Sequence, residues 1–151
     1  AMRPARMALT VQLEVAQRMT AQPGDMSLLA VSMQFYGRPK ICMRLSRGAF
    51  YPVPNVTSAV LRLDLYDDPP IPVDDVARFF AIVKAGFAQR RKQLRNTLSA
   101  TLHLEPDAVE AALNDHGIDH RRRAETLSIP EWGQIYAALA PLVTASPSFS
   151  N

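Results

Sequence analysis

Two stretches of the chain carry side chains whose types and spacing suit ligand binding. The first is a loop in which Phe50 and Tyr51 precede Pro52-Val53-Pro54. Each proline removes a backbone donor and forces the residue before it into an extended conformation. Loops braced by a rigid scaffold commonly carry binding groups. The aromatic ring at the head of this stiff loop is therefore a candidate binding group. The alternative is that Phe50 fills the hydrophobic core.

The second stretch is polar and strongly basic. It follows Phe87 and places four cations and three amides within eight positions, Gln89 to Asn96. Arginine presents planar forks to phosphates and base edges, lysine presents a point charge, and glutamine and asparagine present paired donors and acceptors. Side chains of these types favour a nucleic acid as the ligand, and the candidate binding residues, which become RNA-binding residues under the resemblance described below, are Gln89, Arg90, Arg91, Lys92, Arg95, Asn96 and Arg123.

A second basic cluster, Arg121-Arg122-Arg123, follows about one helical hairpin downstream and can fall on the same face. Two structural alternatives stay open. The clusters can simply form a solvated face, or Arg123 and Glu125 can pair with neighbours and fix the turn before Ser128.

The net charge of +3 is distributed in blocks. Residues 84–96 carry five basic side chains and no acid, whereas residues 97–120 carry five acids and no lysine or arginine. Such blocks indicate discrete basic faces, which are typical of proteins with a polyanionic partner.

Other functions are disfavoured by what the sequence lacks. The six glycines are scattered, so there is no glycine-rich phosphate or cofactor loop. The three histidines have no metal-ligand spacing, and no run is long and apolar enough to span a membrane. The single cysteine, Cys42, lies in an apolar run, which predicts a buried, inert thiol and a reducing, cytoplasmic compartment.

The elements that position these side chains differ between the two parts of the chain. Strands are predicted over Met7–Val11, Lys40–Leu45 and Ser58–Leu65, with helices between the first two. After the linker at 67–72, which is charged and then proline-rich, every pattern is helical. The last helix is expected to begin at Ser128, which has capping-box spacing to Glu131. The tail from Thr144 is expected to be disordered.

Four motifs follow one another along the chain: Val11 to Arg18; Phe50-x-Pro52-x-Pro54-x-Val56-x-Ser58-Ala59-Val60-x-Arg62-Leu63; Phe87-x-Gln89-Arg90-Arg91-Lys92-x-Leu94-Arg95-Asn96; and Arg123-Ala124-Glu125-x-Leu127-Ser128. Together they resemble the motifs of one family, the rRNA adenine N6,N6-dimethyltransferases, which are the 16S rRNA dimethyladenosine transferases of bacteria.

The resemblance implies a C-terminal portion of such an enzyme. The expected fold class is an α/β remnant, the end of a class I methyltransferase Rossmann-like sheet, followed by a small all-α helical domain. The expected domains are 1–68, the end of the methyltransferase domain without its cofactor-binding half; 69–143, a helical rRNA-docking domain; and 144–151, a disordered tail.

The resemblance also implies the chemistry, which is methyl transfer from S-adenosylmethionine to N6 of two adjacent adenosines near the 3′ end of 16S rRNA in the small ribosomal subunit. Phe50 would stack on the flipped target adenine. The cofactor-binding residues are expected to be absent from this chain, which would then be inactive alone.

Three alternatives stay open at this point. The related 23S rRNA methyltransferases of the erythromycin-resistance type have a similar Phe/Pro loop. A non-catalytic RNA-binding or ribosome-assembly module, and a DNA-binding helical domain, also fit the basic helices.

Overall fold

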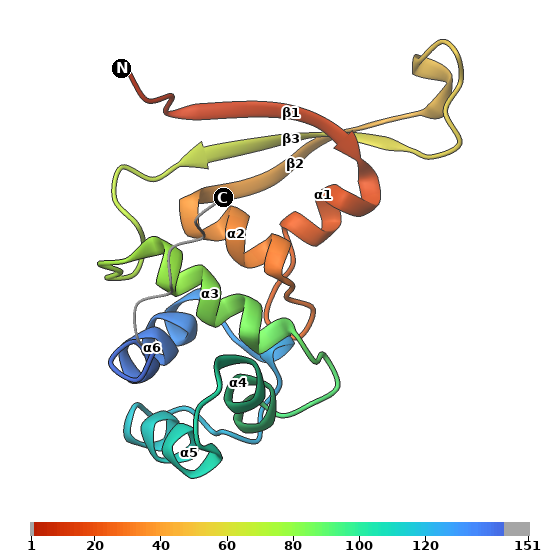
Figure 1. The fold of residues 1–151 in the computed structure, drawn as a ribbon. Coiled ribbons are helices and arrows are strands. Elements are labelled where there is room, and N and C mark those ends of the chain that lie inside the picture. Colours follow the sequence, from red (N-terminus) through yellow and green to blue (C-terminus); the bar gives the residue numbers. More distant parts are fainter. Residues whose placement is uncertain (1, 144–151) are drawn as a thin grey trace, which may run out of the picture. The chain divides into compact units, whose positions relative to one another are not determined.

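The structure is a computed structural model, and it describes residues 2–143. The chain divides into two compact units, with the boundary between Pro70 and Ile71. Unit 1 contains a sheet and two helices, and unit 2 contains helices without strands among its described residues. Both units can be followed along the chain in Figure 1.

Unit 1 is built on a three-stranded sheet in the order β1-β3-β2. The strands are β1 (Arg6–Gln12), β2 (Gly37–Leu45) and β3 (Ser58–Leu65), and β3 pairs antiparallel with both neighbours. The helices α1 (Leu13–Met19) and α2 (Leu28–Tyr36) follow β1 and lie on one side of the sheet (Figure 1).

The sequence of β3 explains which face of the sheet is buried. Successive side chains of a strand point to opposite faces, and Ala59, Leu61 and Leu63 are buried while the residues between them are partly exposed. Ala59 and Leu61 form a small core with Ala16 of α1. The sheet therefore packs its helices on one face and leaves the other face uncovered within unit 1.

The fold class predicted from the sequence is wrong. A Rossmann-like α/β sheet is built mainly from parallel strands joined by crossover helices, whereas both strand pairings here are antiparallel. The described residues of unit 1 form an antiparallel sheet covered by helices on one face, which is an α+β arrangement. The first strand, β1, pairs with β3 through seven residue pairs.

The prediction of a buried cysteine is also wrong, because Cys42 is exposed. The pairing of β2 with β3 shifts between Ile41 and Met43, so Cys42 is the extra residue of a β-bulge. An apolar sequence run does not reveal a bulge, and β2 is an edge strand whose outer side has no neighbour in the sheet.

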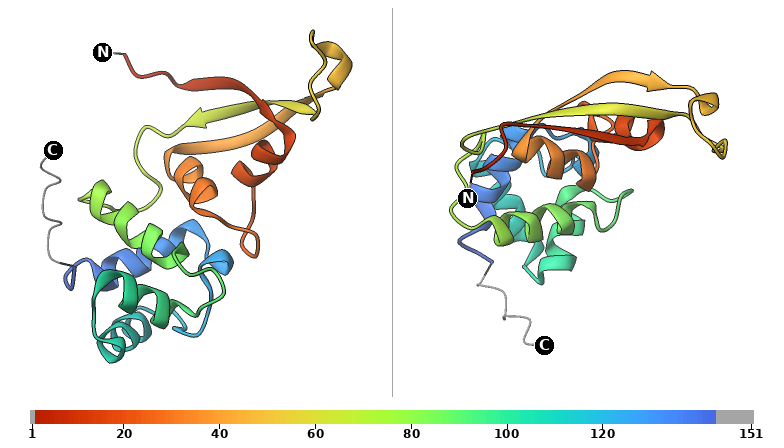
Figure 2. Two further views of the ribbon diagram at one scale, coloured as in Figure 1. Left: turned by 45° about the vertical axis from the view of Figure 1, so that its right-hand side comes forward. Right: turned by 90° about the horizontal axis from the view of Figure 1, so that it is seen from above.

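Unit 2 contains α3 (Val76–Phe87), α4 (Leu94–Leu102), α5 (Pro106–Asp115) and α6 (Ile129–Leu139), with a short 3₁₀ turn at Ala124–Thr126. Figure 2 shows these helices from two further directions. Trp132 of α6 is fully buried and lies against Phe87, with ring centroids 5.6 Å apart. The indole also contacts α3 at Gly86, where a Cβ atom would lie 2.5 Å from Trp132 Cη2. This close approach requires a glycine.

The helix ends in unit 2 follow local sequence signals. Ser128 and Glu131 form the predicted capping box at the start of α6, and Gly117 adopts a positive φ of 76° just after α5. No helix among residues 2–143 is long and apolar enough to cross a membrane. The predicted disorder from Thr144 onward lies outside the described residues.

Candidate nucleic-acid interface

Phe50 lies in the loop that joins β2 to β3, and in Figure 2 this loop extends beyond the end of the sheet. A short 3₁₀ turn, Arg47–Ala49, leads into it, and its far end is fixed where the Leu13 amide donates a 2.9 Å hydrogen bond to the Thr57 carbonyl. The Phe50 residue is 36% exposed and its neighbour Tyr51 is 99% exposed. The ring therefore does not fill the core, and it is accessible for stacking. Its role against an adenine stays a prediction.

The basic stretch forms a tight turn between α3 and α4. The Lys92 amide donates to the Gln89 carbonyl at 2.9 Å, which closes the turn. Arg90, Arg91 and Lys92 are exposed and make no ion pair with any described residue. The turn residues line a shallow open hollow of about 290 Å³. We call Gln89 to Lys92 the basic turn.

The buried side chain of Thr97 fixes the basic turn to the helices around it. Its hydroxyl donates to the Ala85 carbonyl at 2.8 Å and accepts a hydrogen bond from the Gln89 amide at 3.2 Å. A threonine in a helix ordinarily bonds within its own helix, but this one joins α4 to the last turn of α3. The backbone of the basic turn is thereby held while its cations remain free.

Backbone hydrogen bonds bring the second basic cluster to the first. The Leu94 amide donates to the Arg122 carbonyl at 2.8 Å, and the Arg95 amide donates to the His120 carbonyl at 3.1 Å. The first amides of a helix lack partners in their own helix, and here the 120–122 segment supplies them. Arg123, which is exposed and forms no ion pair with the described residues, follows directly. The two clusters thus lie side by side in unit 2.

Arg95 differs from the other predicted RNA-binding cations, because acids of α5 already engage it. Its guanidinium lies 2.9 Å from Asp107 Oδ1 and 2.9 Å from Glu110 Oε2. These contacts join α4 to α5 and leave the side chain only 31% exposed. Its neighbour Asn96 is exposed. Arg95 therefore has a structural role that its position in the sequence motif did not reveal.

Arg122 holds the turn before α6. Its guanidinium pairs with both oxygens of Glu131 and donates to the Thr126 carbonyl at 2.8 Å. The hydrogen bond from Arg122 is the main cause that holds the pKa of the Glu131 carboxyl below its ordinary value. The alternative in which Arg123 and Glu125 fix this turn is therefore wrong: the neighbouring arginine does it, and Arg123 is left free.

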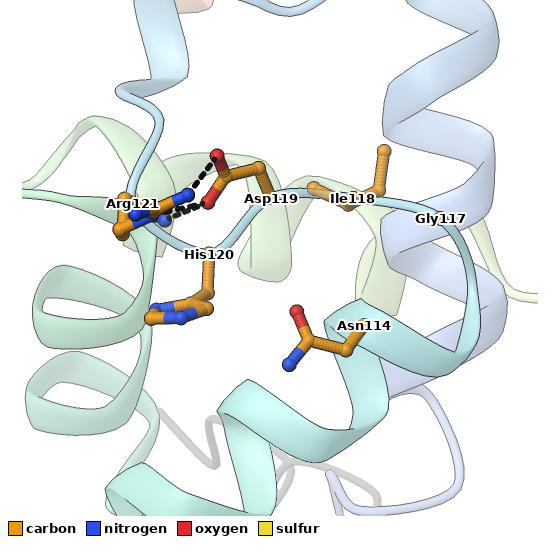
Figure 3. A pocket seen from close by; sticks show the side chains of 6 residues that line it. All are labelled: Asn114, Gly117, Ile118, Asp119, His120 and Arg121. Atoms are coloured by element: carbon orange, nitrogen blue, oxygen red, sulfur yellow. Dashed lines mark hydrogen bonds and ion pairs between the residues drawn. The ribbon is translucent and has the colours of Figure 1, made fainter.

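Arg121 is bound to its own neighbour, as the close view of an adjacent hollow shows (Figure 3). Its guanidinium donates to both carboxylate oxygens of Asp119, at 3.1 and 3.2 Å. The hollow measures about 410 Å³, and its lining includes Asn114 and His120. Because the cation and the acid neutralise each other, this hollow contributes no free positive charge.

The described residues contain no group of three or more histidine, cysteine or acidic side chains that could hold a metal ion.

Among the predicted contact residues, the basic turn and Arg123 combine exposure, free charge and a fixed backbone. That combination suits the binding of phosphates. The signal for the basic turn was present in the sequence, whereas the pairing of Arg95 and Arg122 became visible only in three dimensions.

Comparison with known proteins gives the family. A family model described as "Ribosomal RNA adenine dimethylase" matches residues 1–141. This single match covers residues of both compact units. The predicted fold class had instead divided the chain into the end of a methyltransferase domain and a separate helical domain. Two solved structures are similar in fold. A dimethyladenosine transferase from Plasmodium falciparum aligns with a TM-score of 0.79 and 17% identity, over 93% of this chain and 60% of that chain. The 23S rRNA methyltransferase ErmE aligns with a TM-score of 0.65 and 24% identity, over 90% and 55%.

Curated relatives share more of the sequence. The ribosomal RNA small subunit methyltransferase A of Geobacillus kaustophilus strain HTA426 is 44% identical over 141 residues, which cover 90% of this chain and 48% of the relative. The protein of the same name from Pelotomaculum thermopropionicum is 45% identical over 134 residues, with 87% and 45% coverage. The chain thus spans about half the length of the curated relatives it matches. With the family model matching nearly the whole chain, this protein belongs to the ribosomal RNA adenine dimethylase family.

Proposed function

We propose that this chain serves in the S-adenosylmethionine-dependent dimethylation of N6 of two adjacent adenosines near the 3′ end of 16S rRNA, in the bacterial cytoplasm. Within that reaction it supplies two things. Phe50 stacks on the target adenine, and unit 2 docks on the rRNA of the small ribosomal subunit. The docking contacts are Gln89, Arg90, Arg91, Lys92, Asn96 and Arg123, with Arg95 acting through the helices that it joins.

The observation that carries the proposal is the state of the cations on the basic turn. Arg90, Arg91 and Lys92 are exposed and unpaired among the described residues, while Thr97 holds the backbone below them. Surface arginines that serve only for solubility have no need of such a fixed base. Phosphate contacts of this kind set the orientation of a protein on nucleic acid.

The reaction explains why an accessible aromatic ring is needed. The N6 amino group of adenine is a poor nucleophile, because its lone pair is delocalised into the ring. An enzyme must extrude the base, stack it, and accept hydrogen bonds from the amino group so that the lone pair faces the electrophile. In this proposal Phe50, on its proline-braced loop, forms one wall of such a pocket. S-Adenosylmethionine supplies the methyl group when it is bound.

The described residues do not fit that cofactor. Their glycines are scattered, and no glycine-rich turn leads from a strand into a helix. The hollow beside Asn114 is lined by a neutralised ion pair, and the hollow at the basic turn is open and cationic. Neither offers the carboxylate and apolar pocket that a cationic nucleoside requires. We therefore propose that this chain alone does not transfer methyl groups.

Three other assignments account for less of the structure. ErmE acts on 23S rRNA by its name, but the likeness to it is one of fold, while the relatives at 44–45% identity carry small-subunit names. A DNA-binding helical module gives no role to the exposed Phe50 loop. A purely RNA-binding module describes what this chain does by itself and not the reaction it serves.

Docking can be tested by fluorescence anisotropy with a labelled fragment from the 3′ end of 16S rRNA. Charge reversal at Arg90 and Arg91 is expected to weaken binding at least tenfold and to reduce the salt slope by about two, one for each phosphate contact. The matched control reverses Arg18 and Arg44, which are also exposed and change the net charge equally. Equal losses in both variants would show that the basic turn has no special role.

The inactivity of the chain alone is tested with tritiated S-adenosylmethionine and small-subunit particles. No incorporation above background is expected. Measurable turnover would overturn this part of the proposal without affecting the docking result.

A further inference from the structure

The face of the unit 1 sheet that carries no helix is strongly basic. On β3, Ala59, Leu61 and Leu63 point toward α1 and α2, so Arg62 and Asp64 point the other way. The strand register then places neighbours from both sides on the same face. Opposite Asp64 lie Arg6 of β1 and Arg38 of β2, and opposite Arg62 lies Lys40 of β2. We call this set of five residues the open face.

The open face carries four cations and a single acid, which gives a net charge of +3. Asp64 is ion-paired with Arg6 at 2.6 Å and with Arg62 at 3.3 Å. Both contacts, that from Arg6 foremost, hold the pKa of its carboxyl below the ordinary value. Arg38 and Lys40 have no ion pair within the described residues, and both are exposed.

The free cations are spaced in a regular way. Arg38 and Lys40 are two residues apart on one strand, which separates them by about 7 Å along it. That separation is comparable to the distance between successive phosphates of an extended nucleic-acid strand. The Arg38 guanidinium lies 5.8 Å from the centroid of the Tyr66 ring, which restricts its orientation. A face serving only for solubility would carry the two signs of charge in similar numbers, whereas this one has a single acid among four cations.

We propose that the open face is a second RNA-binding surface, which holds backbone phosphates of the rRNA at a distance of several nucleotides from the target nucleotide. The inference rests on the proposed function for the nature of the polyanion. Charge complementarity identifies the partner. The topology gives the position: β2 runs from Arg38 and Lys40 toward the loop of Phe50, and β3 returns from that loop to Arg62 and Asp64. The open face therefore lies at the end of the hairpin away from the loop, and Lys40 is about 17 Å along β2 from Leu45, where the loop begins.

The test compares three double variants of the chain by anisotropy with the same labelled 16S rRNA fragment, across a range of salt concentrations. Arg38→Glu with Lys40→Glu alters the open face. Arg18→Glu with Arg44→Glu makes the same charge change elsewhere in unit 1, since Arg44 lies opposite Ala59 on the other face of the sheet. Arg90→Glu with Arg91→Glu reports on the basic turn. Circular dichroism melts confirm that each variant is folded.

We expect the Arg38/Lys40 variant to lose at least tenfold in affinity and to reduce the salt slope by about two, while the Arg18/Arg44 variant loses much less. Equal losses in these two variants would overturn the inference, as would an Arg38/Lys40 variant that binds like the unaltered chain. A loss of affinity confined to the Arg90/Arg91 variant would support RNA docking through unit 2 and contradict RNA binding by the open face. A loss confined to the Arg38/Lys40 variant would do the reverse.

Discussion

The Thr97 hydroxyl donates a hydrogen bond of 2.8 Å to the carbonyl of Ala85, and so ties the first turn of α4 to the last turn of α3. Thr97 is fully buried. Because the same oxygen accepts the Gln89 amide, one side chain fixes both ends of the segment that carries the unpaired cations. The stability of unit 2 and the geometry of the basic turn are therefore linked at a single residue.

Replacing Thr97 with valine should destabilise the chain by about 1–3 kcal/mol, because the variant keeps the shape but removes the hydroxyl that donates to the Ala85 carbonyl and accepts from the Gln89 amide. Urea denaturation measures this change. Thr97→Ser keeps the hydroxyl and should recover most of the loss. If valine and serine are equally stable, the hydrogen bonds of Thr97 contribute nothing.

Gly86→Ala should destabilise unit 2 by about 1–3 kcal/mol, because the added methyl group would lie 2.5 Å from the Trp132 ring in a packed core. Gly48→Ala is the matched control, since its Cβ would meet no atom within 4 Å. Thermal melts followed by tryptophan fluorescence report on both variants, because Trp132 is the single tryptophan of the chain. Similar melting temperatures would contradict the tight contact.

Acid should weaken the pairing of Arg122 with Glu131. The arginine holds the pKa of Glu131 below its ordinary value of 4.5. Because the folded-state pKa lies below that of the unfolded chain, the pair contributes its full stability above pH 4.5 and loses it as the pH falls through the folded-state pKa. The stability difference between the unaltered chain and Arg122→Gln should therefore shrink as the pH is lowered from 7 to about 3.

The control for that series is Arg91→Gln, since Arg91 has no ion pair in the described residues. Its stability should differ from that of the unaltered chain by a constant amount across the same pH range. A constant difference for Arg122→Gln as well would show that the ion pair does not depend on the charge of Glu131.

Phe50→Ala should leave the stability of this chain within about 1 kcal/mol of the original, because the ring is partly exposed and its loss opens no core cavity. In a full-length enzyme of the family that carries this segment, the same change should reduce methylation by an order of magnitude or more, whereas Phe50→Tyr should keep the stacking surface. Incorporation of tritiated methyl groups into small-subunit particles measures the effect. An active Phe50→Ala enzyme would show that adenine does not stack there.

Local signals in the sequence predicted several elements correctly. The spacing of Ser128 and Glu131 predicted the capping box, and the Val- and Leu-rich Ser58–Leu65 segment predicted β3. The start of β2 was placed too late, at Lys40, because Gly37 and Pro39 signal a turn. Proline is tolerated there since β2 lies at the edge of the sheet.

Ion pairs and strand pairings between residues far apart in the chain could not be predicted from the sequence. Arg122 and Arg123 are adjacent and alike in sequence, yet one is bound to Glu131 and the other is free. Arg95 likewise matched the family motif as a binding residue, although Asp107 and Glu110 engage it. Which arginine meets an acid depends on where the helices pack, and a single sequence does not contain that information in local form. The same holds for the antiparallel pairing that overturned the predicted fold class.

The hydrogen bonds from the Leu94 and Arg95 amides to the 120–122 segment have a consequence for how tightly a partner is located. Because the amino end of α4 is already occupied by the protein's own carbonyls, no backbone amide there remains to grasp a phosphate. A polyanion bound at the adjacent turn, as proposed, would be held by long side chains with many rotatable bonds. Such side chains can follow small displacements of the bound strand, so in the proposed reaction the accurate placement of the target base would have to come from a stiffer part of the molecule.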